Sequence, residues 1–321
     1  MAQIVDMSQL PKERLEVELI EKVHEGYGGG PRGFVGGWWI QREICYSLIE
    51  LLAIKLDGDN GLLVQYSSDL INPIFTADFI TIKGKIVHIG ETSRTVEFTV
   101  EKTIDGGDIV FDPAGDEQFG GGGQVLAEPQ VLVRGTAVFV VPKDRQRKPL
   151  PTIEGEPIPA PKDYVKFPEP RPSVVDLSQI SEARRKTVLF ERVHEDAKGP
   201  GRGILGPGWT LREAGWLVTE LGIKLDGDSG LVAHYDVNFP GALYAHDWAR
   251  MTAEIVSIGS TSRTMNFTVE KVVDAANLVA DHRPGKEFGG GAVELETPEI
   301  VAEGQVIFVV PKDRQRKELK G

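Results

Sequence analysis

Two copies of one α+β domain are expected within this chain of 321 residues. Three observations support this expectation. Short motifs recur in the same order half a chain apart, each half contains one long helical stretch, and strand-like segments follow that stretch in both halves. Repeats of solenoid proteins are only about 20–50 residues long, so a period of half the chain indicates duplication of a whole domain.

The repeated motifs keep the same order and nearly the same spacing in both halves. The matched pairs are Val23–Glu25 with Val193–Glu195, Leu56–Asp59 with Leu225–Asp228, Thr92–Thr95 with Thr261–Thr264, Phe98–Lys102 with Phe267–Lys271, Phe119–Gly122 with Phe288–Gly291, and Val141–Lys148 with Val310–Lys317. Chance does not produce such an ordered series.

A proline-rich segment separates the copies. Residues 149–173 hold eight of the 20 prolines, which favours an extended, semi-rigid linker. We therefore predict an N-terminal domain over 1–148, a linker over 149–173 and a C-terminal domain over 174–321. Such a linker would let the two domains pair side by side as a pseudo-dimer.

Each copy has one long helix and then strands. Residues 38–56 lack glycine and proline, and residues 209–225 place apolar side chains at helical spacing. Segments rich in β-branched residues follow, over 62–66, 79–89, 95–103 and 130–141 in copy one and over 231–235, 249–258, 264–273 and 299–310 in copy two. One helix followed by antiparallel strands predicts a curved sheet wrapped around a central helix.

Composition excludes several classes of protein. The net charge of −12 argues against nucleic acid as a partner, and no apolar run is long enough to cross a bilayer. The first residues lack the features of a secretory signal, and the single cysteine, Cys45, fits a reducing cytoplasm. Histidine, cysteine and aspartate spacings match no zinc or EF-hand pattern, so we expect no metal site.

The order of motifs in the second copy resembles one enzyme family. Within Tyr235–Lys271 a strand is followed by a turn that ends in His-Asp and by a Gly-x-Thr-Ser-Arg turn, and Thr219–Leu221 shortly precedes Asp226–Asp228. These features resemble the 3-aminobutyryl-CoA and β-alanyl-CoA ammonia-lyases, which are hotdog-fold acyl-CoA enzymes with one domain per chain. The resemblance covers the core of both halves and implies tandem hotdog domains, each an antiparallel sheet around a long central helix.

This resemblance also implies an activity. The chain would reversibly eliminate ammonia from a short β-aminoacyl-CoA to give an enoyl-CoA, with coenzyme A as part of the substrate and no other cofactor. It would act as a homo-oligomer of pseudo-dimers. A base must remove the α-proton, and N–H donors must stabilise the enolate-like oxygen. The start of each central helix can supply such donors, with Gly36, Gly37, Gly206 and Gly208 allowing close approach.

The candidate acid/base is Glu220, within the Thr-Glu-Leu that matches the family. Its helical neighbours are mostly apolar, which predicts a raised pKa, although a solvated helix glutamate is the alternative. Counting back from Asp57, copy one has Leu51 at the equivalent position, and Glu50 lies one residue earlier. That is a rotation of about 100° on a helix, so we expect one competent site or two unequal ones per chain.

The histidine and glutamate residues before each glycine-rich loop are second candidates for acid/base or substrate contact. They are His24 and Glu25 in copy one, and His194 and Glu195 in copy two. The alternative is an exposed strand end, where polar residues are common.

Arg94 and Arg263 resemble the arginine of the family's Thr-Ser-Arg turn. Arginine suits phosphate geometry, so both are candidates to contact coenzyme A. A structural role, in which they bind turn carbonyls or a carboxylate, is the alternative.

Three other functions compete with the lyase. A thioesterase would use a helix carboxylate to activate water, and a non-catalytic acyl-CoA-binding module would need no acid at all. Residues 69–75 resemble a hydratase segment, but Phe75 stands where the histidine base belongs, which disfavours that activity.

Overall fold

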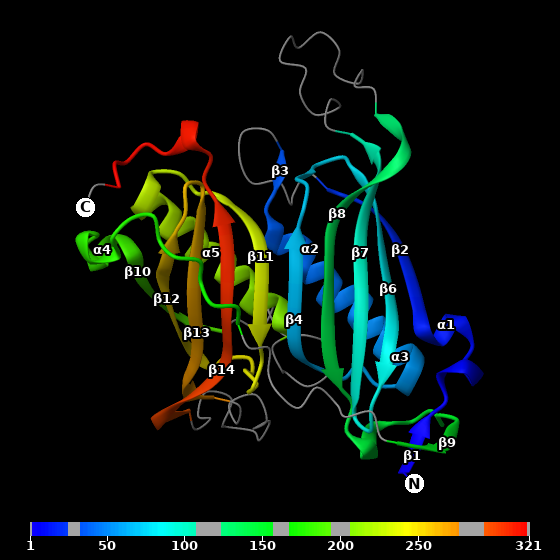
Figure 1. The fold of residues 1–321 in the computed structure, drawn as a ribbon. Coiled ribbons are helices and arrows are strands. Elements are labelled where there is room, and N and C mark those ends of the chain that lie inside the picture. Colours follow the sequence, from blue (N-terminus) through cyan, green and yellow to red (C-terminus); the bar gives the residue numbers. More distant parts are fainter. Residues whose placement is uncertain are drawn as a thin grey trace, which may run out of the picture. The chain divides into compact units, whose positions relative to one another are not determined.

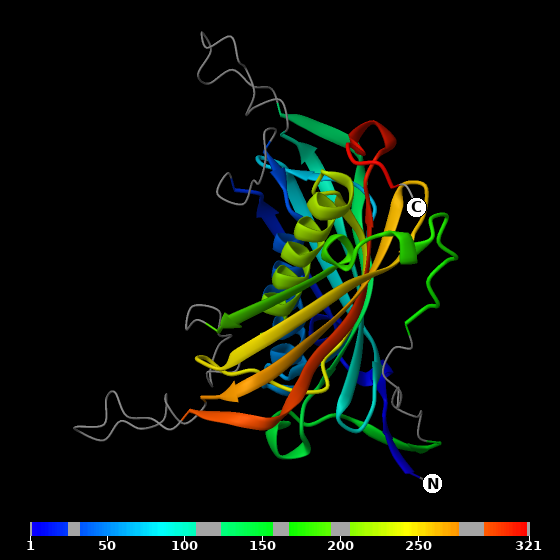
Figure 2. The ribbon, with the colours of Figure 1, turned by 90° about the vertical axis from the view of Figure 1, so that its left-hand side faces the viewer.

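The computed structural model describes residues 2–24, 33–106, 123–156, 167–193, 206–275 and 292–319. The chain divides into two compact units, Met1–Tyr164 (unit 1) and Val165–Gly321 (unit 2). The boundary between them falls inside the proline-rich segment. Figures 1 and 2 show the elements of both units.

Unit 1 is an antiparallel sheet with a helical stretch against one face (Figure 1). The sheet has the strand order β4-β8-β7-β6-β2. Its strands are β2 (Glu16–Lys22), β4 (Leu62–Leu70), β6 (Phe79–Ile89), β7 (Ser93–Asp105) and β8 (Gln124–Val140). The helical stretch comprises α2 (Gly37–Glu43), the π-helical turn η3 (Ile44–Ile49) and α3 (Glu50–Asp57). The short elements are β1 (Ala2–Val5) paired with β9 (Thr152–Gly155), β3 (Phe34–Val35) paired with β5 (Ile74–Phe75), η1 (Met7–Gln9), α1 (Lys12–Leu15) and η5 (Lys143–Arg145).

Unit 2 repeats this topology. Its sheet has the order β10-β12-β13-β14-β11, again with antiparallel neighbours. The strands are β10 (Lys186–Arg192), β11 (Leu231–Asn238), β12 (Trp248–Ile258), β13 (Ser262–Asp274) and β14 (Val293–Val309). The helix α5 (Pro207–Asp226) lies along the concave face of this curved sheet (Figure 2). The short helices are η6 (Leu177–Gln179), α4 (Glu182–Arg185) and η8 (Lys312–Arg314). The α+β arrangement expected of each copy is therefore confirmed within each unit.

Both central helices end in the same way. Gly58 and Gly227 follow the last helical residues with φ of 80° and 81°, a left-handed conformation that ends a helix and favours glycine. The Asp-Gly-Asp segments thus act as helix ends, a role that suits their turn-forming residues.

The π-helical turn explains the difference in register between the copies. It gives the helical stretch of unit 1 one residue more than α5. Counted from the helix start, Glu43 therefore corresponds to Glu213. Counted back from the helix end, Leu51 corresponds to Glu220. The extra residue lies between these two positions, and π-turns are frequent at functional sites.

A buried polar cluster distinguishes the two cores. In unit 1 the Tyr66 hydroxyl donates to the side-chain oxygen of the buried Gln41, and the Ser68 hydroxyl donates to the same oxygen over 3.2 Å. In unit 2 Leu211 replaces the glutamine. The hydroxyl of the fully buried Tyr235 has no hydrogen-bond partner among the described residues.

This difference predicts opposite effects for the same substitution. Tyr66→Phe should lower the free energy of unfolding by about 1–2 kcal/mol, because Gln41 loses a buried hydrogen bond. Tyr235→Phe should leave it unchanged or raise it, because an unpaired buried hydroxyl is removed. Chemical denaturation of both variants measures the difference, and equal losses would contradict it.

Candidate functional site

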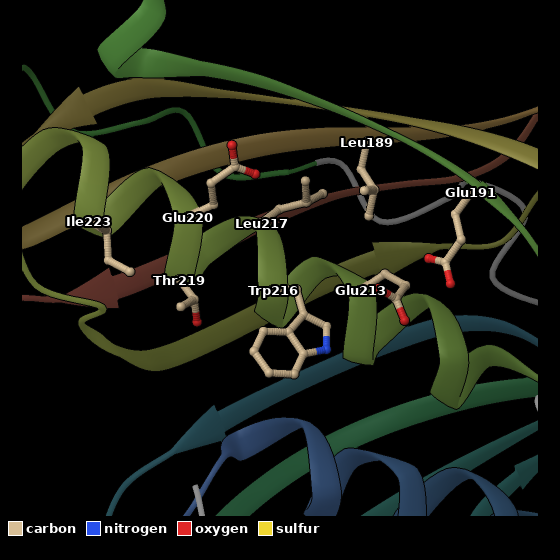
Figure 3. Close-up of a pocket in the computed structure, with 8 residues that line it drawn as sticks. All are labelled: Leu189, Glu191, Glu213, Trp216, Leu217, Thr219, Glu220 and Ile223. Atoms are coloured by element: carbon tan, nitrogen blue, oxygen red, sulfur yellow. The ribbon is translucent and has the colours of Figure 1, made fainter. Parts of the chain in front are cut away.

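Unit 2 contains a cavity of about 480 Å³ between β10 and α5 (Figure 3). It is lined by Leu189, Glu191, Glu213, Trp216, Leu217, Thr219, Glu220 and Ile223. The helix residues share one face of α5 because they recur three and four positions apart. The two strand residues share a face because side chains alternate along a strand. All charged residues of this lining are carboxylates, and most of the others are apolar.

Glu213 is the most deeply placed of these carboxylates, with an exposed fraction of 4%. The guanidinium of Arg212 donates to its Oε1 from Nε over 2.6 Å and from Nη2 over 2.5 Å. Burial raises the pKa of Glu213 and outweighs the arginine, and the charge of Glu191 raises this pKa further. A buried carboxyl group whose pKa is raised becomes a stronger base when ionised, which suits it to general acid–base chemistry.

Glu220 also lines the cavity, but its environment differs from the one predicted. Its side chain is 45% exposed; it accepts a hydrogen bond from Thr187 over 2.7 Å and pairs with Lys224 at 2.5 Å. Partial burial works to raise the pKa of Glu220, but the two hydrogen bonds and the lysine charge together lower it. The predicted raised pKa is therefore wrong. The reason is the charge of Lys224, which lies one helical turn after Glu220 among otherwise mostly apolar neighbours.

Glu50 has the raised pKa that was expected of Glu220. It is half-buried at the start of α3, and burial raises the pKa of its carboxyl group to about 7. Its position corresponds to Thr219 of the cavity and not to Glu220, because Leu51 occupies the latter place. The acid of copy one is thus present but rotated on the helix.

The opposite pKa shifts of Glu50 and Glu220 predict opposite effects of pH on stability. The folded-state pKa of Glu50 lies above its ordinary value of 4.5, so its contribution is present below pH 4.5 and is lost as pH rises through about 7. We expect Glu50→Gln to raise the unfolding temperature at pH 8 and to change it little at pH 4. Glu220→Gln is the control: because that pKa is lowered, it should destabilise the protein at pH 8. Thermal unfolding at both pH values tests this, and shifts of the same sign at pH 8 would contradict it.

A pair of facing carboxylates recurs in unit 1. Burial and the charge of Glu43 raise the pKa of Glu21 to about 6, and the Ser47 hydroxyl donates to Glu43 over 3.0 Å. By register, this pair corresponds to Glu191 and Glu213. Sequence reasoning missed all four residues, although their recurrence in both copies was a signal that could have found them.

The predicted glycines lie at the start of each central helix, and those of α2 are tightly packed. Gly36 and Gly206 are the N-caps of α2 and α5, and neither helix has a side-chain cap within the described residues. A Cβ on Gly36 would lie 2.7 Å from the Trp38 ring, and one on Gly37 would lie 2.5 Å from Leu70. Packing therefore explains these two glycines, and a role in substrate binding stays a prediction for them and for the buried Gly208.

The histidine and glutamate candidates are only partly described. His24 is exposed immediately after β2 and the buried Val23. Glu25, His194 and Glu195 lie outside the described residues. Their catalytic role stays a prediction.

The two turn arginines form buried ion pairs, which corrects their assignment to coenzyme A. Both side chains have an exposed fraction of 0%. Arg94 binds both carboxylate oxygens of Asp57 at 3.0 and 2.8 Å, and its Nη1 donates to the carbonyls of Gly90 and Ser93. Arg263 repeats the arrangement with Asp226. Guanidinium groups that are buried and bonded in this way tie the helix end to the strand turn and are closed to a phosphate.

Within the part of the chain that the structure describes, no three histidine, cysteine or acidic side chains gather as metal ligands would. None of the described helices has the length and apolar character to span a membrane.

Comparison with known proteins places the chain in a family. The 3-aminobutyryl-CoA ammonia lyase of Acetoanaerobium sticklandii is 35% identical over 134 residues, which is 99% of that protein and 41% of this chain. The chain belongs to the 3-aminobutyryl-CoA ammonia lyase family. This confirms the resemblance found in the sequence. No family model matches the chain.

Solved structures resemble this chain beyond the region that the relative matches, but they do so in fold alone. A putative thioesterase from Novosphingobium aromaticivorans is 14% identical, with a TM-score of 0.52 over 94% of this chain and 98% of that one. A putative oleoyl thioesterase from Lactobacillus plantarum is 13% identical, with a TM-score of 0.53 over 94% and 97%. The sheet around a helix in each unit is consistent with the hotdog fold that the resemblance implied.

Proposed function

We propose that the chain catalyses the reversible elimination of ammonia from a short β-aminoacyl-CoA, giving an enoyl-CoA. The observation that carries this proposal is the 35% identity over nearly the whole of a 3-aminobutyryl-CoA ammonia lyase. The cavity of unit 2 supports it, because the reaction needs a carboxyl group of suitable pKa in a largely apolar site.

In this mechanism Glu213 exchanges the proton of the substrate. Its carboxylate removes the α-proton, which the thioester acidifies. The C–H electron pair becomes the π bond between the α- and β-carbons. The bond from the β-carbon to the protonated amino group breaks, and its electron pair leaves with ammonia. In the reverse direction the protonated Glu213 returns the proton to the α-carbon as ammonia adds to the β-carbon.

Geometry along α5 supports this choice. Glu213 follows Gly208 by five residues, which is about 7.5 Å along the helix axis. Helical side chains lean toward the N-terminus, so the carboxylate lies closer to the first turn than its backbone does. A thioester oxygen at the N–H of Gly208, in a first turn that no side chain caps, would place the α-carbon within reach of Glu213.

We assign the base to Glu213 in preference to Glu220. The Lys224 ion pair lowers the pKa of Glu220, which keeps the group charged near neutrality and makes it a weaker base. Glu220 then serves as a charged part of the cavity wall.

One assay separates the lyase from its competitors. The full chain is incubated with crotonyl-CoA and ammonium while enoyl absorbance and free thiol are both followed. Loss of absorbance without free thiol supports the lyase, and release of free thiol establishes a thioesterase in its place. Binding of the thioester with neither change would establish a non-catalytic module.

Pairing of the two units as a pseudo-dimer, further association of chains, a cytoplasmic location and the lack of another cofactor stay predictions. Small-angle scattering and analytical ultracentrifugation of the full chain test the first two. A sedimenting species with the mass of one chain would contradict the predicted oligomer.

A further inference from the structure

The charges around the unit 2 cavity are not balanced. Glu213 is paired with Arg212, and Glu220 is paired with Lys224. Glu191, the third carboxylate of the lining, has no ion pair or hydrogen bond to any described residue. Glu191 also lies close enough to Glu213 for its charge to raise the pKa of that carboxyl group. The two negative charges therefore disfavour each other. A positively charged ligand group would relieve this repulsion.

An aromatic ring lines the same cavity as the unpaired carboxylate. Trp216 lines the same cavity with an exposed fraction of 54%, and it leaves α5 one turn after Glu213. Figure 3 shows Trp216 and Glu213 on neighbouring turns, with Glu191 approaching from β10. A ring face attracts cations, and tryptophan does so most strongly among the aromatic side chains. An apolar occupant would use the ring but not the carboxylate, whereas an ammonium group uses both.

We propose that Trp216 and Glu191 form the part of the cavity that selects acyl groups carrying an ammonium group. This inference rests on the proposed function, in which the substrate bears nitrogen on its β-carbon. It assigns substrate selection to residues other than the proton-transferring Glu213.

Two unreactive ligands test the proposal. S-(3-aminobutyl)-CoA and S-butyl-CoA are thioethers that lack the thioester carbonyl, so neither undergoes elimination, and they differ only in the amino group. Calorimetric titration of the full chain measures the dissociation constant of each. The variants are Trp216→Leu, Trp216→Phe and Glu191→Gln. Tyr46→Leu is the control, because Tyr46 stands at the same distance from the helix start in unit 1.

Trp216→Leu should weaken binding of the amino ligand by about three- to thirtyfold and leave the butyl ligand within about twofold. Trp216→Phe should restore part of the loss, Glu191→Gln should repeat the selective loss, and Tyr46→Leu should change neither constant. Equal weakening of both ligands, or none, would overturn the proposal. Selective loss in a protein that does not aminate crotonyl-CoA would support it while removing the proposed activity. Amination with no selective loss would do the reverse.

Discussion

Replacement of Glu213 by glutamine is expected to lower the turnover number for crotonyl-CoA amination by about 10²–10⁴-fold, the usual contribution of a general base. Glutamine keeps the shape of the side chain and can still face Arg212, so the unfolding temperature should change little. In the wild-type protein kcat/KM should titrate above the ordinary pKa of a glutamate, because burial raises that of Glu213. This ionisation should disappear in the variant. Steady-state rates between pH 5 and 9 measure both effects.

Two matched variants make the result decisive. Glu220→Gln should reduce the rate much less, because that carboxylate is already held by Lys224 and Thr187. If Glu220→Gln is inactive while Glu213→Gln keeps its rate, the base is Glu220 after all. Glu43→Gln carries the same change at the equivalent position of unit 1. A half-loss in each single variant, with inactivity of the double variant, would indicate two equal sites and contradict the expectation of one competent site or two unequal ones.

The fold could be predicted well because the duplication shows each pattern twice. The helix and the strands after it carry periodic apolar residues, and the structure confirms them. The strands β2 and β10 were missed. In their segments, Glu16–Lys22 and Lys186–Arg192, the outward positions mix charged residues with exposed apolar ones such as Ile20 and Phe190, so the usual alternation of apolar and polar residues is weak.

The site was harder to predict, because it depends on what each carboxylate faces. Sequence spacing placed Glu220 on an apolar strip, but it could not show Thr187 approaching from a strand distant in sequence. The same limit applies to Glu191 and Glu213, whose proximity depends on how β10 packs against α5. The extra π-helical residue of unit 1 also moves Glu50 out of register with Glu220. No local sequence pattern predicts such a π-helical turn.

The turn arginines show how a family motif can mislead. A Thr-Ser-Arg sequence at the start of a strand suggests an exposed guanidinium that can bind a phosphate. Asp57 and Asp226, the last residues of their helices, are both fully buried. Their carboxylates accept hydrogen bonds from the turn arginine of the same unit. The repeated pairing of a helix-end aspartate with a turn arginine is visible in the sequence, but only burial shows that the two meet.

Arg263→Ala should therefore destabilise the protein strongly, by about 3–5 kcal/mol, because it leaves the buried Asp226 without its counter-charge. The loss should be concentrated in unit 2, where hydrogen exchange of α5 and β13 should accelerate, since Arg263 joins these elements. Arg250→Ala is the matched control on the neighbouring strand β12. That arginine is 42% exposed and pairs with Glu270 at 2.9 Å, so its removal should cost at most about 1 kcal/mol.

The same variant decides between the two roles of this arginine. A phosphate contact predicts weaker binding of coenzyme A thioesters with unchanged stability, whereas a buried ion pair predicts the opposite order of effects. Asp226→Asn sharpens the distinction, because asparagine removes the charge that Arg263 needs without touching any surface to which a phosphate could bind. Both variants should thus lose stability together. A stable Arg263→Ala protein with impaired thioester binding would mean that the guanidinium reaches the ligand in solution.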